Sequence, residues 1–248
     1  MTAYLLLAAV AVAVGLFIGT VGVGGILLIP ALTYLGGLTV HSATATALFT
    51  FAFTGILGTI LFQRRGSIDW RITVPVCAGA VVFSVLGAWA NSRIDARPLA
   101  LIIAGIIIFA GAYILLPSRR DAGHRDGRSP AERAMLVGVG AVSGFGSGLS
   151  GAGGPLFSVP IMVLAGFVPL AAVGTSQVLQ IVAAVFGTAG NLAYGTIDFG
   201  VAAWITLFEL AGVVAGVRLA HAVSVGTLRR LAAGLCIVVG ALMLWRNL

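Results

Sequence analysis

Two glycine-rich segments are the best candidates for chemistry in this sequence. One runs from Gly19 to Gly25 and the other from Gly148 to Gly154, and each interrupts a long apolar stretch. Glycine allows tight or left-handed backbone that other residues resist, so each segment predicts a break between two helical pieces. A helix that starts after such a break presents free N–H groups and the positive end of its dipole, which attract anions. The two segments therefore predict an anion site built from backbone groups.

Hydroxyl and amide side chains open the helix that follows each broken pair. Such side chains often cap the free N–H groups of a helix start. They could equally donate hydrogen bonds to the oxygens of an oxyanion, and both interpretations stay open at this point. The predicted substrate-binding residues are Gly22, Gly24, Gly25, Thr46, Gly151, Gly153, Gly154, Thr175, Ser176 and Gln177.

Two further residues could couple binding to protons. Glu209 is the only carboxylate well inside an apolar run. A charge at such a place is costly and suggests function, although a hydrogen-bonded packing role is the alternative. His41 can titrate near neutral pH, but at a helix start it could also serve as a cap. Asp69 and Asp198 each follow Gly-x-Ile and precede an apolar run, which predicts helix N-caps.

Enzyme chemistry has little support in the sequence. Gly146 to Gly151 matches a dinucleotide-binding glycine pattern, but no strand precedes it. A nucleophilic Ser150 would need a base within reach, and the only downstream histidine, His221, falls at a predicted helix end. No cysteine or histidine spacing suggests a metal site. We therefore expect no enzyme activity, no metal and no cofactor.

Composition places the chain in a lipid bilayer. Of its 248 residues, 60% are hydrophobic and only 8% are charged. A soluble domain has about 25% charged residues, so this composition excludes an ordinary soluble enzyme. The net charge of +7 comes from arginines in short loops between apolar runs. That distribution follows the positive-inside rule and lacks the basic face expected for nucleic-acid binding.

Ten apolar runs predict an all-α polytopic membrane protein. Six runs approach the length of about 20 residues that a spanning helix needs, and four shorter ones form the two glycine-broken pairs. The sequence thus predicts about eight transmembrane helices. A polar segment at 118–130 reads as a cytoplasmic linker. It separates a first transmembrane repeat, residues 1–117, from a second, residues 131–248.

The two halves resemble each other. A shift of 129 residues places eleven glycines on glycines, including Gly24 on Gly153. The same shift places Ile68-Asp69 on Ile197-Asp198. Internal duplication of this kind is typical of transporters, which bind substrate at the repeat interface between broken helices.

Arginine positions favour inverted repeats. If each broken pair returns to its starting side, Arg93, Arg97 and Arg246 lie outside and the other 11 of the 14 arginines lie inside. If each pair crosses once, the split becomes nine against five. The positive-inside rule favours the first arrangement, with both termini outside.

These motifs resemble the sulfite exporter TauE/SafE family, also called the toluene sulfonate uptake permease class. The resemblance rests on Gly22-Val23-Gly24-Gly25 followed by Pro30, the helix opening at Val40 with Thr46, Gly151-Ala152-Gly153-Gly154, and Gly174-Thr175-Ser176. It covers essentially the whole chain, and this sequence departs from the usual pattern at Ala47, where a serine normally follows the threonine. The resemblance implies an inner-membrane carrier, usually counted as eight-helix, for sulfite, sulfonates or related organosulfur anions.

We therefore expect a multi-pass secondary transporter of the cell inner membrane. Its partners would be a small sulfur oxyanion or sulfonate and the lipid bilayer, with proton coupling through Glu209 or His41 as an option. The alternatives are a proton-coupled carrier of another small organic anion and a non-transporting membrane subunit. The oligomeric state does not follow from the sequence.

Overall fold

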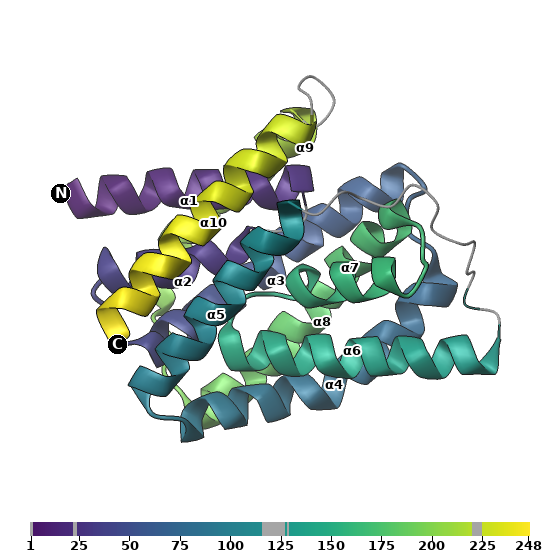
Figure 1. The fold of residues 1–248 in the computed structure, drawn as a ribbon, viewed down its shortest axis with the longest axis horizontal. Helices are drawn as coiled ribbons and strands as arrows, with labels where there is room; N and C mark the ends of the chain where they lie inside the picture. The colour runs from purple at the N-terminus through teal and green to yellow at the C-terminus, as the bar shows by residue number, and fades with distance from the viewer. Residues whose placement is uncertain (1, 22–23, 116–126, 128, 220–224) are drawn as a thin grey trace.

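The computed structural model describes residues 2–21, 24–115, 127, 129–219 and 225–248. Gly22, His221 and most of the 118–130 segment lie outside these described residues. Every regular element of the described residues is a helix, as Figure 1 shows, which confirms the predicted all-α class. Its elements are α1 (Thr2–Val21), η1 (Gly25–Leu27), α2 (Leu28–Tyr34), α3 (Val40–Arg64), α4 (Trp70–Arg93), α5 (Ala96–Leu115), α6 (Pro130–Ser150), α7 (Pro155–Leu164), α8 (Pro169–Tyr194), α9 (Phe199–Leu219) and α10 (Val225–Asn247).

Five of these helices are each long and apolar enough to cross a membrane: most or all of α3, α4, α5, α8 and α9. About eight spans were predicted from the sequence. The described apolar parts of α1, α7, α10 and the joined η1 and α2 are shorter, and α6, although 21 residues long, is not among the five. A multi-pass membrane protein follows from the five long helices alone.

Polar residues at the helix starts explain where several elements begin. The Asp69 carboxylate accepts a hydrogen bond from the Arg71 N–H at 2.9 Å, and the Asp198 carboxylate accepts one from the Val201 N–H at 2.9 Å. Both predicted N-caps are therefore confirmed, at the starts of α4 and α9. Thr39 caps α3 in the same way. These caps satisfy donors that the first turn of a helix cannot satisfy itself.

Two helix pairs are in direct backbone contact. Helix α4 packs along α6, and α1 packs along α9. Gly140, Gly144 and Gly148 of α6 face the backbone or small side chains of Val76, Ala80 and Ser84 on α4. Such small residues let helices approach closely in lipid, where apolar side chains alone give little driving force. In the second pair the close contacts are Gly15 against the Glu209 backbone, Gly212 against Val12, and Gly216 against Leu16.

A substitution on α6 tests this packing. We expect Gly140→Ala to lower stability by about 1–3 kcal/mol, because its Cβ would collide with the Val76 carbonyl oxygen. Gly138→Ala is the matched control on the same helix, since its Cβ would meet no atom within 4 Å. Thermal unfolding of the detergent-solubilised protein measures both. Equal melting temperatures for the two variants would contradict close α4–α6 packing.

The helix bounds of the two halves correspond. Adding 129 to the first residues of α3, α4 and α5 gives the first residues of α8, α9 and α10. The α1–α9 and α4–α6 contacts correspond under the same shift: Gly15 faces Glu209, and Gly144 faces Ala80. Each close pair therefore joins one helix from each half.

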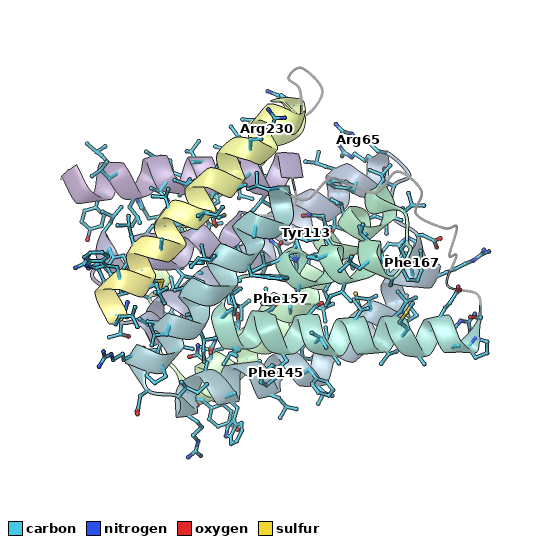
Figure 2. All side chains as sticks on the ribbon, viewed as in Figure 1. Arg65, Tyr113, Phe145, Phe157, Phe167 and Arg230 are labelled. Carbon is cyan, nitrogen blue, oxygen red and sulfur yellow. The ribbon has the colours of Figure 1, made fainter. Side chains whose placement is uncertain are left out.

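Both ends of the chain lie on the same side of the molecule, on the left in Figure 1. In Figure 2, Arg230 in α10 lies at the top and Arg65 at the end of α3 lies to its right, both away from the two termini. The core of the molecule is formed by two clusters of buried apolar side chains. The larger is built mainly from α1, α2, α3, α5 and α10, with residues of η1, α7, α8 and α9, and the smaller gathers α4, α6, α7 and α8.

Candidate functional site

The two glycine-rich breaks meet at one buried cavity. Gly24, Gly25 and Ile26 at the start of η1 line one part of its wall, and Pro155 and Leu156 at the start of α7 line another. Figure 2 shows Phe157, the next residue of α7, near the middle of the molecule. The remaining lining residues are Ile18, Phe51, Ala152 and Gln180. The structure thus brings together the two helix starts that the sequence singled out.

The cavity is very small. It offers about 10 Å³, close to the smallest space that admits a single water molecule. A sulfur oxyanion carries several oxygens around its sulfur and needs more room. An anion could therefore enter only after the surrounding helices separate.

The ring of Phe51 fills the space between the breaks. A Cβ added at Gly25 would lie 2.6 Å from the ring, and one added at Gly153 would lie 3.3 Å from it. Gly153 has a left-handed backbone with φ of 80°, and Gly151, the C-cap of α6, has φ of 67°. Such angles favour glycine, because other residues place Cβ too near the following carbonyl oxygen.

At Gly24 and Gly154, close contacts rather than a left-handed backbone angle leave room only for glycine. A Cβ at Gly24 would lie 2.6 Å from the Cβ of Phe17, and one at Gly154 would lie 3.0 Å from the Leu179 side chain. The glycines of both breaks therefore serve close packing, and Gly24 and Gly25 of the first break also line the cavity.

The predicted hydroxyl ligands make structural hydrogen bonds instead of lining the cavity. Thr46 accepts from the Asp198 N–H at 3.1 Å. The Thr175 and Thr73 hydroxyl oxygens lie 2.9 Å apart, and Ser176 donates to the Val173 carbonyl at 2.7 Å. The Thr46 bond ties α3 to the start of α9, the Thr175 bond ties α8 to the start of α4, and the Ser176 bond lies within α8. As observed, they agree with the capping and packing interpretation of these residues.

Gln177 is buried without a hydrogen-bond partner for either its amide oxygen or its nitrogen. Its side chain lies against Gly58 of α3. The residue 129 positions earlier, Leu48, lies against Gly187 in the matching place. An amide therefore occupies a site that holds leucine in the other half. Burying an unpaired amide is costly, so this position needs an explanation beyond packing.

Gln180 and Phe51 line the cavity but were missed from the sequence. The Gln180 amide nitrogen donates to the Phe51 carbonyl oxygen at 3.2 Å and to the Thr54 hydroxyl oxygen at 2.8 Å. A polar residue amid the apolar α8 was a usable signal for Gln180. Phe51 gave none, because a phenylalanine inside an apolar helix looks like any core residue.

Glu209 lies in the interior and is not on the cavity wall. Its side chain is fully buried, and both carboxyl oxygens lack a hydrogen-bond partner. The neighbouring Thr50 hydroxyl donates to the Ala47 carbonyl at 2.9 Å. His41 lies elsewhere: its Nε2 is 2.9 Å from the carbonyl oxygen of Ile94, the C-cap of α4. That contact joins the start of α3 to the end of α4.

No metal site accompanies the cavity: among the described residues, no three histidine, cysteine or acidic side chains gather as ligands. The polar groups on its wall are the backbone groups of the two helix starts and the amide of Gln180. They suit the binding of an anion through hydrogen bonds.

The sequence model of the family described as sulfite exporter TauE/SafE matches residues 7–243. The chain belongs to this family. Among its relatives, a probable membrane transporter protein of Bacillus subtilis, YdhB, is 28% identical over 210 residues, covering 82% of this chain and 85% of the relative. The probable membrane transporter protein MJ0441 of Methanocaldococcus jannaschii is 24% identical over 263 residues, covering 97% of both chains. No solved structure matches the chain.

Membership of the TauE/SafE family agrees with the five apolar spanning helices. Together they identify a multi-pass membrane protein and support a role in transport. Both named relatives are described as probable membrane transporter proteins.

Proposed function

We propose that this TauE/SafE member is a secondary transporter of a small sulfur oxyanion, with sulfite or a short sulfonate as the leading substrates. The observation that carries the proposal is the meeting of two broken-helix starts at one buried cavity. First-turn N–H groups have no partner within their own helix, so they can donate to an oxyanion without a charged side chain. Gly22, Gly24, Gly25, Gly151, Gly153 and Gly154 would shape this site.

The binding residues from α3 and α8 form a second layer in this proposal. Thr46, Thr175 and Ser176 would hold the surrounding helices in place, and Gln177 would supply an unused amide when those helices separate. The unpartnered amide of Gln177 is the main support for its role.

We further propose two inverted repeats, residues 1–117 and 131–248, joined by a cytoplasmic linker at 118–130 in the cell inner membrane. The matching helix bounds and the matching α1–α9 and α4–α6 contacts support the duplication. The placement of Arg65 and Arg230 away from both termini supports inversion and an outward-facing N- and C-terminus.

Transport would proceed by alternating access. Because α1 with α9 and α4 with α6 are in backbone contact, each pair would move as a rigid body that contains helices from both halves. The cavity would open to one side and then to the other as these bodies rock about the central site.

Flux into proteoliposomes that contain only this protein tests the proposal. Sulfite, thiosulfate, sulfate, a short sulfonate and a short carboxylate would each be offered, with and without a pH gradient. We expect selective movement of at least one sulfur oxyanion or sulfonate. Movement of the carboxylate alone would point to the alternative carrier of another organic anion, and no movement by folded protein would point to a non-transporting subunit.

One observation favours proton coupling as a second element of the function. The buried carboxyl of Glu209 has no hydrogen-bond partner, and an intramembrane carboxyl of this kind is typical of proton-coupled carriers. His41 is the weaker candidate, since its ring is engaged with the Ile94 carbonyl at the end of α4.

A further inference from the structure

The amide of Gln180 spans the two halves of the protein at the cavity wall. Gln180 belongs to α8, whereas its partners, Phe51 and Thr54, belong to α3. Gln180 and Thr54 are both buried, so water does not compete for these hydrogen bonds. The Gln180 bonds therefore help to keep α3 and α8 together beside the cavity.

The chemistry of the partners fixes which end of the amide faces α3. The Phe51 carbonyl oxygen can only accept a hydrogen bond, so the group facing it must be the NH₂ of Gln180. The Thr54 hydroxyl donates to the same carbonyl at 3.3 Å, which leaves its oxygen free to accept from Gln180. Both donors of the NH₂ group are therefore committed to α3 while the cavity is closed.

Gln180 and Phe51 occupy equivalent positions in the two halves. The shift of 129 residues places Gln180 on Phe51, so the two repeat-related residues stand at the same cavity. One half supplies an aromatic ring that fills the space, and the other supplies hydrogen-bond donors. A small oxyanion offers only acceptors, so the Gln180 NH₂ is the side-chain donor on this wall that suits it.

We propose that Gln180 is a latch and a substrate ligand in turn: its NH₂ holds α3 against α8 in the empty closed state and transfers to an oxyanion when the cavity opens. This inference rests on the proposed anion site and adds a residue that determines its affinity. Opening breaks two hydrogen bonds, and the anion replaces their acceptors. Anion binding and separation of α3 from α8 are thereby linked.

Two substitutions separate the two roles. Thr54→Val removes an acceptor of the latch and leaves the donor for the anion, so the closed state competes less with binding. We expect the dissociation constant for radiolabelled sulfite to fall about fivefold. Gln180→Leu removes latch and ligand together, and we expect that constant to rise at least about tenfold. Thr59→Val is the matched control on α3, because the Thr59 hydroxyl is buried without a partner and does not line the cavity; it should change nothing.

A purely structural role for Gln180 would move sulfite affinity in the same direction in both variants, and that result would overturn the inference. So would unchanged affinity in both. A general loss of stability would not raise sulfite affinity in Thr54→Val and lower it in Gln180→Leu.

The latch can also be measured without any anion. Ala152 lines the cavity and would be replaced by cysteine in a protein with Cys77 and Cys236 changed to alanine. We expect Thr54→Val and Gln180→Leu each to raise the rate at which a small thiol reagent labels this cysteine, and Thr59→Val to leave it unchanged. Equal rates in all variants would overturn the latch. Absence of sulfite binding by the unmodified protein would contradict the proposed substrate instead, and the labelling rates would still decide the latch.

Discussion

Replacing Gly153 with valine is expected to abolish sulfite binding and flux. Its backbone has φ of 80°, and its Cβ would lie 3.3 Å from the Phe51 ring and 3.7 Å from the Gln180 amide oxygen. The new side chain would therefore occupy the space into which an anion must enter. We expect the loss to be complete in proteoliposome flux, because the added side chain would stand against both Phe51 and Gln180 on the cavity wall.

Gly66→Val is the control for backbone strain. Gly66 has φ of 64°, yet a Cβ there would meet no atom within 4 Å, so it shares the strain without the obstruction. Each variant should lose about 1–3 kcal/mol of stability, and only Gly153→Val should lose flux. If Gly153→Val does not fold, Gly25→Ala tests the same site, since its Cβ would press on the Phe51 ring. Normal sulfite binding by folded Gly153→Val and by Gly25→Ala would place the site elsewhere.

Replacing Glu209 with glutamine is expected to remove the response of flux to a pH gradient. Glutamine keeps the shape of the side chain but cannot take up or release a proton. For one coupled proton, a gradient of about one pH unit can drive about tenfold accumulation of the substrate. Glu209→Gln should reduce this accumulation to none while leaving exchange of labelled sulfite across the membrane intact.

The surroundings of Glu209 make it the group to test. Helix α1, which packs against it, carries no charged residue, and Tyr4 lies near its far end. The ionisable residues of α3, His41 and Arg64, lie at the two ends of that helix, and Arg218 lies at the end of α9. His41→Gln is therefore the matched control and should keep the pH response. A pH response that survives Glu209→Gln would show that protons are coupled elsewhere or not at all.

Much of the fold could be predicted because a bilayer constrains sequences strongly. Each apolar run became a helix, since backbone groups in lipid must be satisfied within the segment. The breaks at Gly24 and Gly153 were predicted because a single helix through either would exceed the bilayer and because glycine tolerates the required turn. Asp69 and Asp198 were predicted as caps for an equally local reason.

The candidate site was only partly predictable. Thr46, Thr175 and Ser176 matched the chemistry of an oxyanion ligand, but a hydroxyl near a helix start bonds just as readily to protein groups. Whether such a hydroxyl binds an anion or a protein group depends on which acceptors and donors the neighbouring helices place beside it. Gln180 and Phe51 became site residues only because α3 and α8 cross beside the two breaks.

The sequence by itself determined the class of protein, the helical segments, the two broken pairs and the family. The first three follow from composition, run length and glycine position. The family follows from the motifs of both halves, which the family model matches over residues 7–243. Only the tertiary structure decided that α1 pairs with α9 and α4 with α6, that the two breaks share one cavity, and that Glu209 lacks a partner. Those features depend on which helix surfaces meet across the two halves, and no local pattern in the chain encodes that meeting.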